Sequence, residues 1–134
     1  MRVIGPSEKK IIYVAGPYSA KPGRFRERPF KFSEEDQNIS RARECALTIW
    51  ALGAVALCPH LNSLHMGIDL EGIGIDTSEL FYRGDLDLMK RCDAVYMMMD
   101  WQYSSGARLE REWATQWNMT IFYDLDSLSQ WVKQ

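Results

Sequence analysis

Apolar residues recur along the chain in two alternating patterns. Short runs rich in β-branched and aromatic residues are typical of buried strands, and longer stretches with apolar residues every three or four positions are typical of helices. The predicted strands cover residues 11–15, 54–58, 94–99 and 120–123. The predicted helices lie between a cap at Ser33 and a stop at Gly53, and over residues 80–92, 106–118 and 125–132. This order predicts an α/β fold, a three-layer flavodoxin-like or Rossmann-like parallel sheet with helices on both faces.

Two segments interrupt this alternation. Residues 20–32 form a basic loop after the first strand, either a solvated loop or a mobile lid that attracts an anionic substrate. Ser33 followed by Asp36 resembles a capping box at the start of the next helix. Residues 61–79 are glycine-rich and weakly periodic, which indicates a long loop with or without one helical turn. No linker or repeat divides the chain, so we expect residues 1–134 to form a single domain.

Composition excludes several classes of protein. The chain has 134 residues, of which 46% are hydrophobic and 25% charged, with a net charge of −2. These percentages are ordinary for a globular protein. The slightly negative net charge predicts no general attraction to a nucleic acid polymer or an anionic membrane. No apolar stretch could span a membrane, and the first residues do not form a signal peptide. Three cysteines in apolar contexts indicate reduced, buried thiols of a cytoplasmic protein. They are Cys45, Cys58 and Cys92.

The segment between the third strand and the third helix carries the most chemical information. Ser104, Ser105 and Gly106 form a turn where a strand ends and a helix begins, which is where open α/β sheets bind ligands. The free amides and the dipole of a helix N-terminus suit an anionic group. Glu110, in the first turn of that helix, is either a catalytic carboxylate or an acid that merely complements the dipole.

Other candidate residues follow the strands at the same edge of the sheet. They are Gly16, Pro17, Tyr18 and Ser19 after the first strand, His60 after the second and Trp101 after the third. Asp85, early in the helix over 80–92, can face this edge, or it is an ordinary helix-start acid. Two carboxylates near a turn suited to phosphate suggest chemistry at a glycosidic or phosphoryl centre.

Metal and cofactor motifs are weak in this chain. His60, His65 and Asp69 could hold a metal, but their spacing fits no zinc site. The Gly72-Ile73-Gly74 segment lacks the third glycine and the preceding strand of a dinucleotide-binding turn, and the chain has no P-loop motif. We therefore expect neither a metal nor an organic cofactor.

In four segments the sequence resembles the nucleoside 2-deoxyribosyltransferase family, which includes the 2′-deoxynucleoside 5′-monophosphate N-hydrolases. These segments lie between residues 11 and 124, and their joint order is more specific than any one of them. They are Ile12 to Pro17; Ala54 to His60; Asp85-Leu86 with Asp93-Ala94-Val95; and Ser104 to Glu110 with Trp113-Ala114. Short, phage-like proteins share this plan, and Trp101 fits that subgroup, either stacking on a base or packing at the sheet edge.

The resemblance implies a role for each matching residue. Glu110 matches the nucleophile that attacks the anomeric carbon, Asp85 the carboxylate that assists departure of the base, and Tyr13 the tyrosine that orients the glutamate. Ser104 matches the serine that contacts the 5′-phosphate, and residues 16–19 match the loop that closes on the nucleotide. The resemblance also implies a homo-oligomer, a dimer or larger. Trp113, Trp117 and Trp131 would suit its interface, although burial against the sheet explains them equally well.

The implied function is cleavage of the N-glycosidic bond of a nucleoside or nucleoside 5′-monophosphate, by hydrolysis or base exchange. The monophosphate hydrolases carry an arginine- and glycine-rich turn after the first strand, where this chain has Lys21 and Arg24 at a different spacing. The alternatives are a non-catalytic nucleotide-binding or sensing module and a related NAD-cleaving or phosphoribohydrolase enzyme. The Gly-Gly-x-Gly-Thr signature of the phosphoribohydrolases is absent from this sequence.

Overall fold

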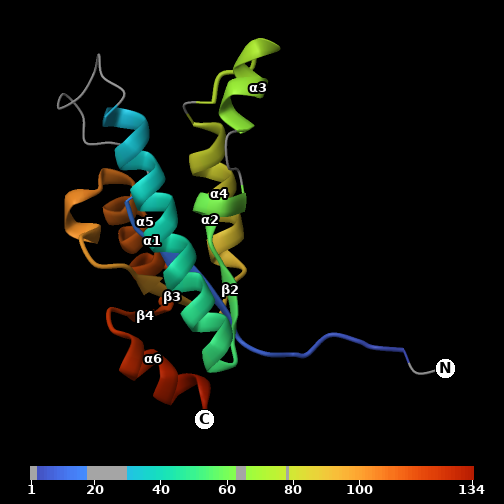
Figure 1. Ribbon diagram of the computed structural model, residues 1–134. Helices are drawn as coiled ribbons and strands as arrows, with labels where there is room; N and C mark the ends of the chain where they lie inside the picture. The colour runs from blue at the N-terminus through green and yellow to red at the C-terminus, as the bar shows by residue number, and fades with distance from the viewer. Residues whose placement is uncertain (1–2, 18–29, 63–65, 78) are drawn as a thin grey trace.

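The computed structural model describes residues 3–17, 30–62, 66–77 and 79–134 (Figure 1). Its centre is a four-stranded parallel sheet in the order β2-β1-β3-β4. The strands are β1 (Ile11–Ala15), β2 (Val55–Leu57), β3 (Ala94–Met97) and β4 (Thr120–Phe122). This architecture confirms the predicted α/β fold and is compatible with a three-layer flavodoxin-like arrangement.

Helices cover both faces of the sheet, and α1 passes in front of it in Figure 1 while α5 lies behind. The long helices are α1 (Phe30–Leu52), α4 (Leu80–Lys90), α5 (Ser105–Gln116) and α6 (Leu125–Val132). The short ones are α2 (Pro59–Asn62), α3 (Met66–Gly72) and the 3₁₀ turn η1 (Trp101–Tyr103). Two apolar clusters form the core, one under α1 and α6 and the other under α4 and α5.

The central strand β1 supplies side chains to both clusters. Ile12 and Val14 pack towards α1 and α6, whereas Tyr13 and Ala15 pack towards α4 and α5. This division follows from the two-residue period of a strand, whose successive side chains point to opposite faces. All four of these side chains are fully buried, as expected for a central parallel strand covered on both sides.

The first helix begins earlier than its sequence pattern predicts. It starts at Phe30, so Ser33 lies inside it and the predicted capping box with Asp36 is wrong. A capping contact is worth only about 1 kcal/mol, and serine inside a helix costs a few tenths, so a longer run of backbone hydrogen bonds outweighs the cap. The predicted end is confirmed, because Gly53 follows the helix with a φ of +102°, a conformation that suits glycine.

The segment over residues 61–79, predicted as a loop with or without one helical turn, holds more helix than expected. The structure places the end of α2 and the whole of α3 within it. Glycine destabilises a helix least near its ends. Gly67 and Gly72 lie near the two ends of α3. The glycine content therefore marked the ends of a short helix rather than a structureless segment.

Candidate functional site

Three candidate residues from three elements meet on the α4/α5 face of the sheet. The Tyr13 hydroxyl, from the middle of β1, donates a hydrogen bond to Oε2 of Glu110 on α5. Asp85, on α4, lies close enough for its charge to raise the pKa of both Tyr13 and Glu110. The structure thus brings together the three residues to which the sequence resemblance assigns catalytic roles.

Local sequence explains why Glu110 points inward. Ala107 and Ala114 are buried at 1% and 0% exposure, and Glu110 lies three residues after the first and four before the second. Residues at this spacing share one face of a helix, so Glu110 lies on the face of α5 that packs against the sheet. Small neighbours leave room for the carboxylate to reach Tyr13 beneath it.

Loss of hydration makes both carboxyl groups unusually weak acids. Desolvation raises the pKa of the half-buried Glu110 to about 7, an effect that the nearby charge of Asp85 increases and the hydrogen bond from Tyr13 opposes. Desolvation also raises the pKa of Asp85 to about 6. Burial and the two carboxylates strongly raise the pKa of Tyr13, so its hydroxyl stays protonated as a donor. Both carboxyls therefore titrate close to neutral pH, as acid–base groups in active sites often do.

The simple explanation of both carboxylates as helix-start acids is wrong. Glu110 is the sixth residue of α5, which begins at Ser105, and Asp85 is the sixth residue of α4, which begins at Leu80. Neither helix has an acidic residue in its first turn. The helix dipole acts within the first turn, so it explains neither side chain.

The predicted phosphate turn forms the start of α5. Ser104 is the N-cap residue, and its Oγ accepts a hydrogen bond of 3.2 Å from the amide of Ala107. Ser105 and Gly106 follow in the first turn, where helical amides lack a partner within the helix. Such a turn suits an anion, but capping alone accounts for Ser104, so its contact with phosphate stays a prediction.

The end of β1 is held by close packing and by a buried histidine. A Cβ on Gly16 would lie 2.6 Å from Sδ and 2.9 Å from Cβ of Met98, so only glycine fits there without a shift. His60 is 5% exposed, and its Nε2 lies 2.6 Å from the carbonyl oxygen of Pro17. Because a carbonyl only accepts, Nε2 carries the proton, and burial lowers the pKa of the ring. His60 thus anchors this segment.

Several predicted residues lie outside the described residues. They are Tyr18, Ser19, Lys21, Arg24 and His65.

Trp101 lies in a cluster at the edge of the site. Its ring centroid is 5.8 Å from that of Tyr123, and the guanidinium of Arg111 lies 5.0 Å from it. Arg111 Nε also donates a 2.7 Å hydrogen bond to the hydroxyl of Tyr123. These contacts account for packing at the sheet edge, and stacking of Trp101 on a base stays a prediction.

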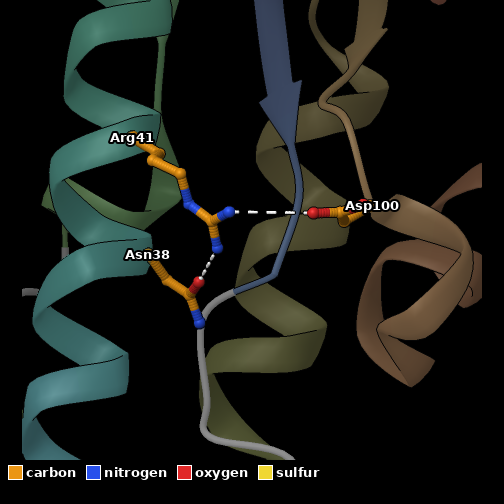
Figure 2. Close-up of polar contacts among 3 residues, drawn as sticks. All are labelled: Asn38, Arg41 and Asp100. Carbon is orange, nitrogen blue, oxygen red and sulfur yellow. Dashed lines mark hydrogen bonds and ion pairs between the residues drawn. The ribbon is translucent and has the colours of Figure 1, made fainter.

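Sequence reasoning missed a polar group on the other side of β1, drawn in Figure 2. Asn38 is 3% exposed, and its Oδ1 accepts a hydrogen bond from Nη2 of Arg41. Nη1 of Arg41 lies 3.7 Å from Oδ2 of Asp100. One signal was available, because Asn38 precedes the buried Ala42 by one helical turn and is therefore a polar residue in an apolar stripe. Asp100 directly follows the third predicted strand, at the edge of the sheet where ligands bind, whereas nothing local marks Arg41.

An open hollow of about 650 Å³ borders this polar group. It is lined by Asp36, Gln37, Ser40 and Arg41, all on α1. Its lining includes none of the three candidate catalytic residues, so it is not a pocket around the Tyr13–Glu110 pair.

The remaining groups of chemical interest are the thiols and the possible metal ligands. All three cysteines are free, but only Cys58 is fully buried, whereas Cys45 and Cys92 are half-buried. Burial raises the pKa of Cys45 and of Cys92 to about 11, so these thiols are poor nucleophiles at neutral pH. Among the described residues, no group of three or more His, Cys, Asp or Glu side chains could hold a metal ion.

No helix in the described part of the chain is both long and apolar enough to cross a membrane.

Fold and site together define an α/β protein with two half-buried, weakly acidic carboxyls on one face of a parallel sheet. The chain belongs to the family described as a domain of unknown function (DUF4406), which matches residues 10–123. The match covers the whole sheet and includes Tyr13, Asp85 and Glu110. No curated protein matches the chain in sequence.

Proposed function

We propose that this protein cleaves the N-glycosidic bond of a nucleoside or nucleoside 5′-monophosphate, with Glu110 as the nucleophile. One observation carries the proposal: Glu110 is withdrawn from water, receives a hydrogen bond from Tyr13 and lies near Asp85. The resemblance to the nucleoside 2-deoxyribosyltransferase family supports the same roles for these residues. The products would be the free base and either the free sugar or a sugar joined to a second base.

The reaction uses one carboxyl group as nucleophile and the other as acid. An oxygen of the Glu110 carboxylate bonds to the anomeric carbon as the carbon–nitrogen bond breaks, and the bonding electrons leave with the base. Asp85 donates a proton to the departing base, which is otherwise a poor leaving group. Water or a second base then attacks the anomeric carbon and releases Glu110, while Asp85 takes the proton back. The substrate is a small molecule, and side chains supply each step.

The reactive state requires an ionised Glu110 and a protonated Asp85. Their pKa values, about 7 and about 6, mean that between these two values the pair holds one proton, mostly on Glu110, so the reactive arrangement is the minor one of the two. Tyr13 favours the reactive arrangement because its hydroxyl donates to the ionised form of Glu110. The rate should therefore follow a bell-shaped pH profile with its maximum between the two values.

A product assay tests the proposal. Wild type, Glu110→Ala and Glu112→Ala are incubated with ribo- and deoxynucleosides and their 5′-monophosphates, with and without a second free base, and released or exchanged base is measured. Glu112 is an exposed acid on the same helix and serves as the control. We expect base release by wild type and the control, and a loss of at least about a thousandfold in Glu110→Ala.

A different result would support the alternative function, a nucleotide-binding or sensing module, in place of the enzyme. If wild type releases no base from any substrate while a nucleotide raises its melting temperature, the protein is a non-catalytic nucleotide-binding or sensing module. Chromatography with light scattering, on the same preparation, tests the homo-oligomer that the family resemblance implies.

A further inference from the structure

A hydrogen bond between two aromatic side chains joins the helices that carry the two carboxyl groups. Nε1 of Trp113, on α5, donates to the hydroxyl oxygen of Tyr82, on α4, at 3.1 Å. Tyr82 precedes Asp85 by three residues, and Trp113 follows Glu110 by three. Residues at this spacing lie on nearly the same side of a helix, one turn apart. The bond therefore crosses from α4 to α5 about one helical turn from each carboxyl group.

Apolar packing is sparse in the first half of α4, where Asp85 lies. Among the described residues of this helix only Met89, near its end, is buried. Leu80 at its start is 45% exposed, and the side chain of the N-cap residue Glu79 makes no capping hydrogen bond. Gly84, directly before Asp85, has no side chain to pack, and the space where a Cβ would lie is open. The position of this half of the helix therefore depends on contacts that neighbouring side chains make with α5.

The far ends of the two helices are joined by other contacts. Met89 of α4 belongs to the same apolar cluster as Ala114 of α5. Nζ of Lys90 lies 5.1 Å from the ring centroid of Trp117, which directly follows α5. The ring of Trp117 is in turn 5.4 Å from that of Trp113. The hydrogen bond between the two aromatic side chains thus completes a seam of which the apolar cluster holds only one end.

The separation of the two helices matters because the carboxyl groups act on each other. Among the described residues, the titratable groups that act on Glu110 are Asp85 on α4 and Tyr13 on β1. The charge of Asp85 raises the pKa of Glu110, and an electrostatic interaction weakens with distance. A wider gap would also admit water to both carboxyls. Movement of α4 away from α5 should therefore lower the pKa of Glu110 towards its ordinary value.

We propose that Tyr82 and Trp113 are positioning residues, whose hydrogen bond keeps Asp85 close to Glu110. Neither aromatic side chain needs to touch the substrate for this role. Its catalytic consequence rests on the proposed function, in which the acid and the nucleophile must reach the same glycosidic bond. Its effect on the carboxyl pair does not depend on that function.

The test removes each partner of the hydrogen bond and measures the carboxyl pair itself. Carbon-13 NMR of labelled glutamate and aspartate gives the pKa of Glu110 and of Asp85 in wild type, Tyr82→Phe, Trp113→Phe and the double variant. Tyr82→Phe removes one oxygen atom, and Trp113→Phe removes the indole N–H but keeps an aromatic ring. The control is Trp50→Phe, because Trp50 is 53% exposed and lies on α1, across the sheet. Melting curves establish that each variant is folded.

We expect the pKa of Glu110 to fall by about 0.3–1 pH unit in Tyr82→Phe and in Trp113→Phe. The double variant should shift it no further than the larger single change, because both substitutions break the same bond. Trp50→Phe should leave it unchanged. A smaller fall or a rise in Tyr82→Phe would overturn the proposal even if the variant is less stable, because a merely structural tie affects stability alone. Two full shifts that add in the double variant would also overturn it, since each side chain would then act separately.

The titration separates this inference from the proposed function, because it needs no substrate. If wild type releases no base while the pKa of Glu110 falls in Tyr82→Phe, the function fails and the positioning role stands. If wild type releases base, Tyr82→Phe should lower kcat by about ten- to a hundredfold, because the acid is misplaced. The alkaline limb of its rate profile should also move to lower pH by the measured shift. A Tyr82→Phe variant with the kcat and the alkaline limb of wild type would overturn the positioning role and leave the function intact.

Discussion

The two faces of β1 differ in what packs against them. Towards α1 and α6 the strand presents Ile12 and Val14 to an apolar cluster built largely from small and aliphatic side chains. Towards α4 and α5 it presents Tyr13, above which two carboxyl groups are partly withdrawn from water. One strand thus supplies a stabilising layer on one side and a chemical site on the other.

Both faces bury apolar side chains, but only the α4/α5 face also carries the cost of withdrawing a carboxyl group from water. Burial of apolar side chains under α1 favours folding by about 1.5–3 kcal/mol for each large residue. Holding Glu110 with a pKa of about 7, against an ordinary value of 4.5, costs up to about 3 kcal/mol at a pH above both. Carboxyl groups with raised pKa values are concentrated at functional sites, so the α4/α5 face is the one to test for function. Four substitutions test the comparison.

The largest effect is expected on the apolar face. Ile49, on the face of α1 that packs against the sheet, is fully buried, so Ile49→Ala should lower the free energy of unfolding by about 2–5 kcal/mol through lost transfer energy and a cavity. Urea unfolding measures the change. Leu47, on the same helix and 51% exposed, provides the control, and Leu47→Ala should stay within about 0.5 kcal/mol. Equal losses in the two variants would contradict the assignment of the core.

The opposite sign is expected on the chemical face. Between pH 4.5 and about 7 the unfolded chain loses the Glu110 proton before the folded chain does, so stability falls as the pH rises through this range. Glu110→Gln removes this loss and should raise the free energy of unfolding by about 1–3 kcal/mol at pH 8, with little change at pH 4. Unfolding at both pH values measures it, with Glu112→Gln as control. A variant less stable than wild type at pH 8 would refute the desolvation cost.

A smaller loss is expected where the strand ends. Gly16→Ala places a methyl group 2.6 Å from Sδ and 2.9 Å from Cβ of Met98, so the two segments must separate. We expect a loss of about 1–3 kcal/mol in unfolding free energy. A methyl group on Gly5 would have no atom within 4 Å, so Gly5→Ala is the matched control. If Gly16→Ala unfolds like the control, the close approach to Met98 is not needed.

The smallest expected effect is a change in the pKa of Glu110. The hydroxyl of Tyr13 donates to Glu110 and lowers the pKa of that carboxyl, so Tyr13→Phe should raise it further, by about one pH unit or less. Carbon-13 NMR of labelled glutamate measures this pKa without any substrate. If the protein is active, the alkaline limb of the rate profile should move to higher pH by the same amount, because the higher of the two pKa values belongs to Glu110. An unchanged or lower pKa would show that Tyr13 does not support the ionised form.

Sequence patterns predicted most of the fold and part of the site. The strands and long helices were located to within a few residues, except at the start of α1, where helix length outweighed a local capping motif. The three residues that the family resemblance singled out do lie together. The sequence marks Asn38 as a polar residue in an apolar stripe, whereas no local pattern predicts the ion pair of Arg41 with Asp100.

By itself the sequence determined the order of strands and helices, because hydrophobic period and glycine positions act over a few neighbouring residues. It also supplied the chemical groups. Only the tertiary structure decided that Tyr13 turns towards α4 and α5, that Glu110 lies in the second turn of its helix, and that α1 brings Arg41 to Asp100. These contacts join residues far apart in the chain, so they depend on strand register and helix packing, which no local pattern encodes.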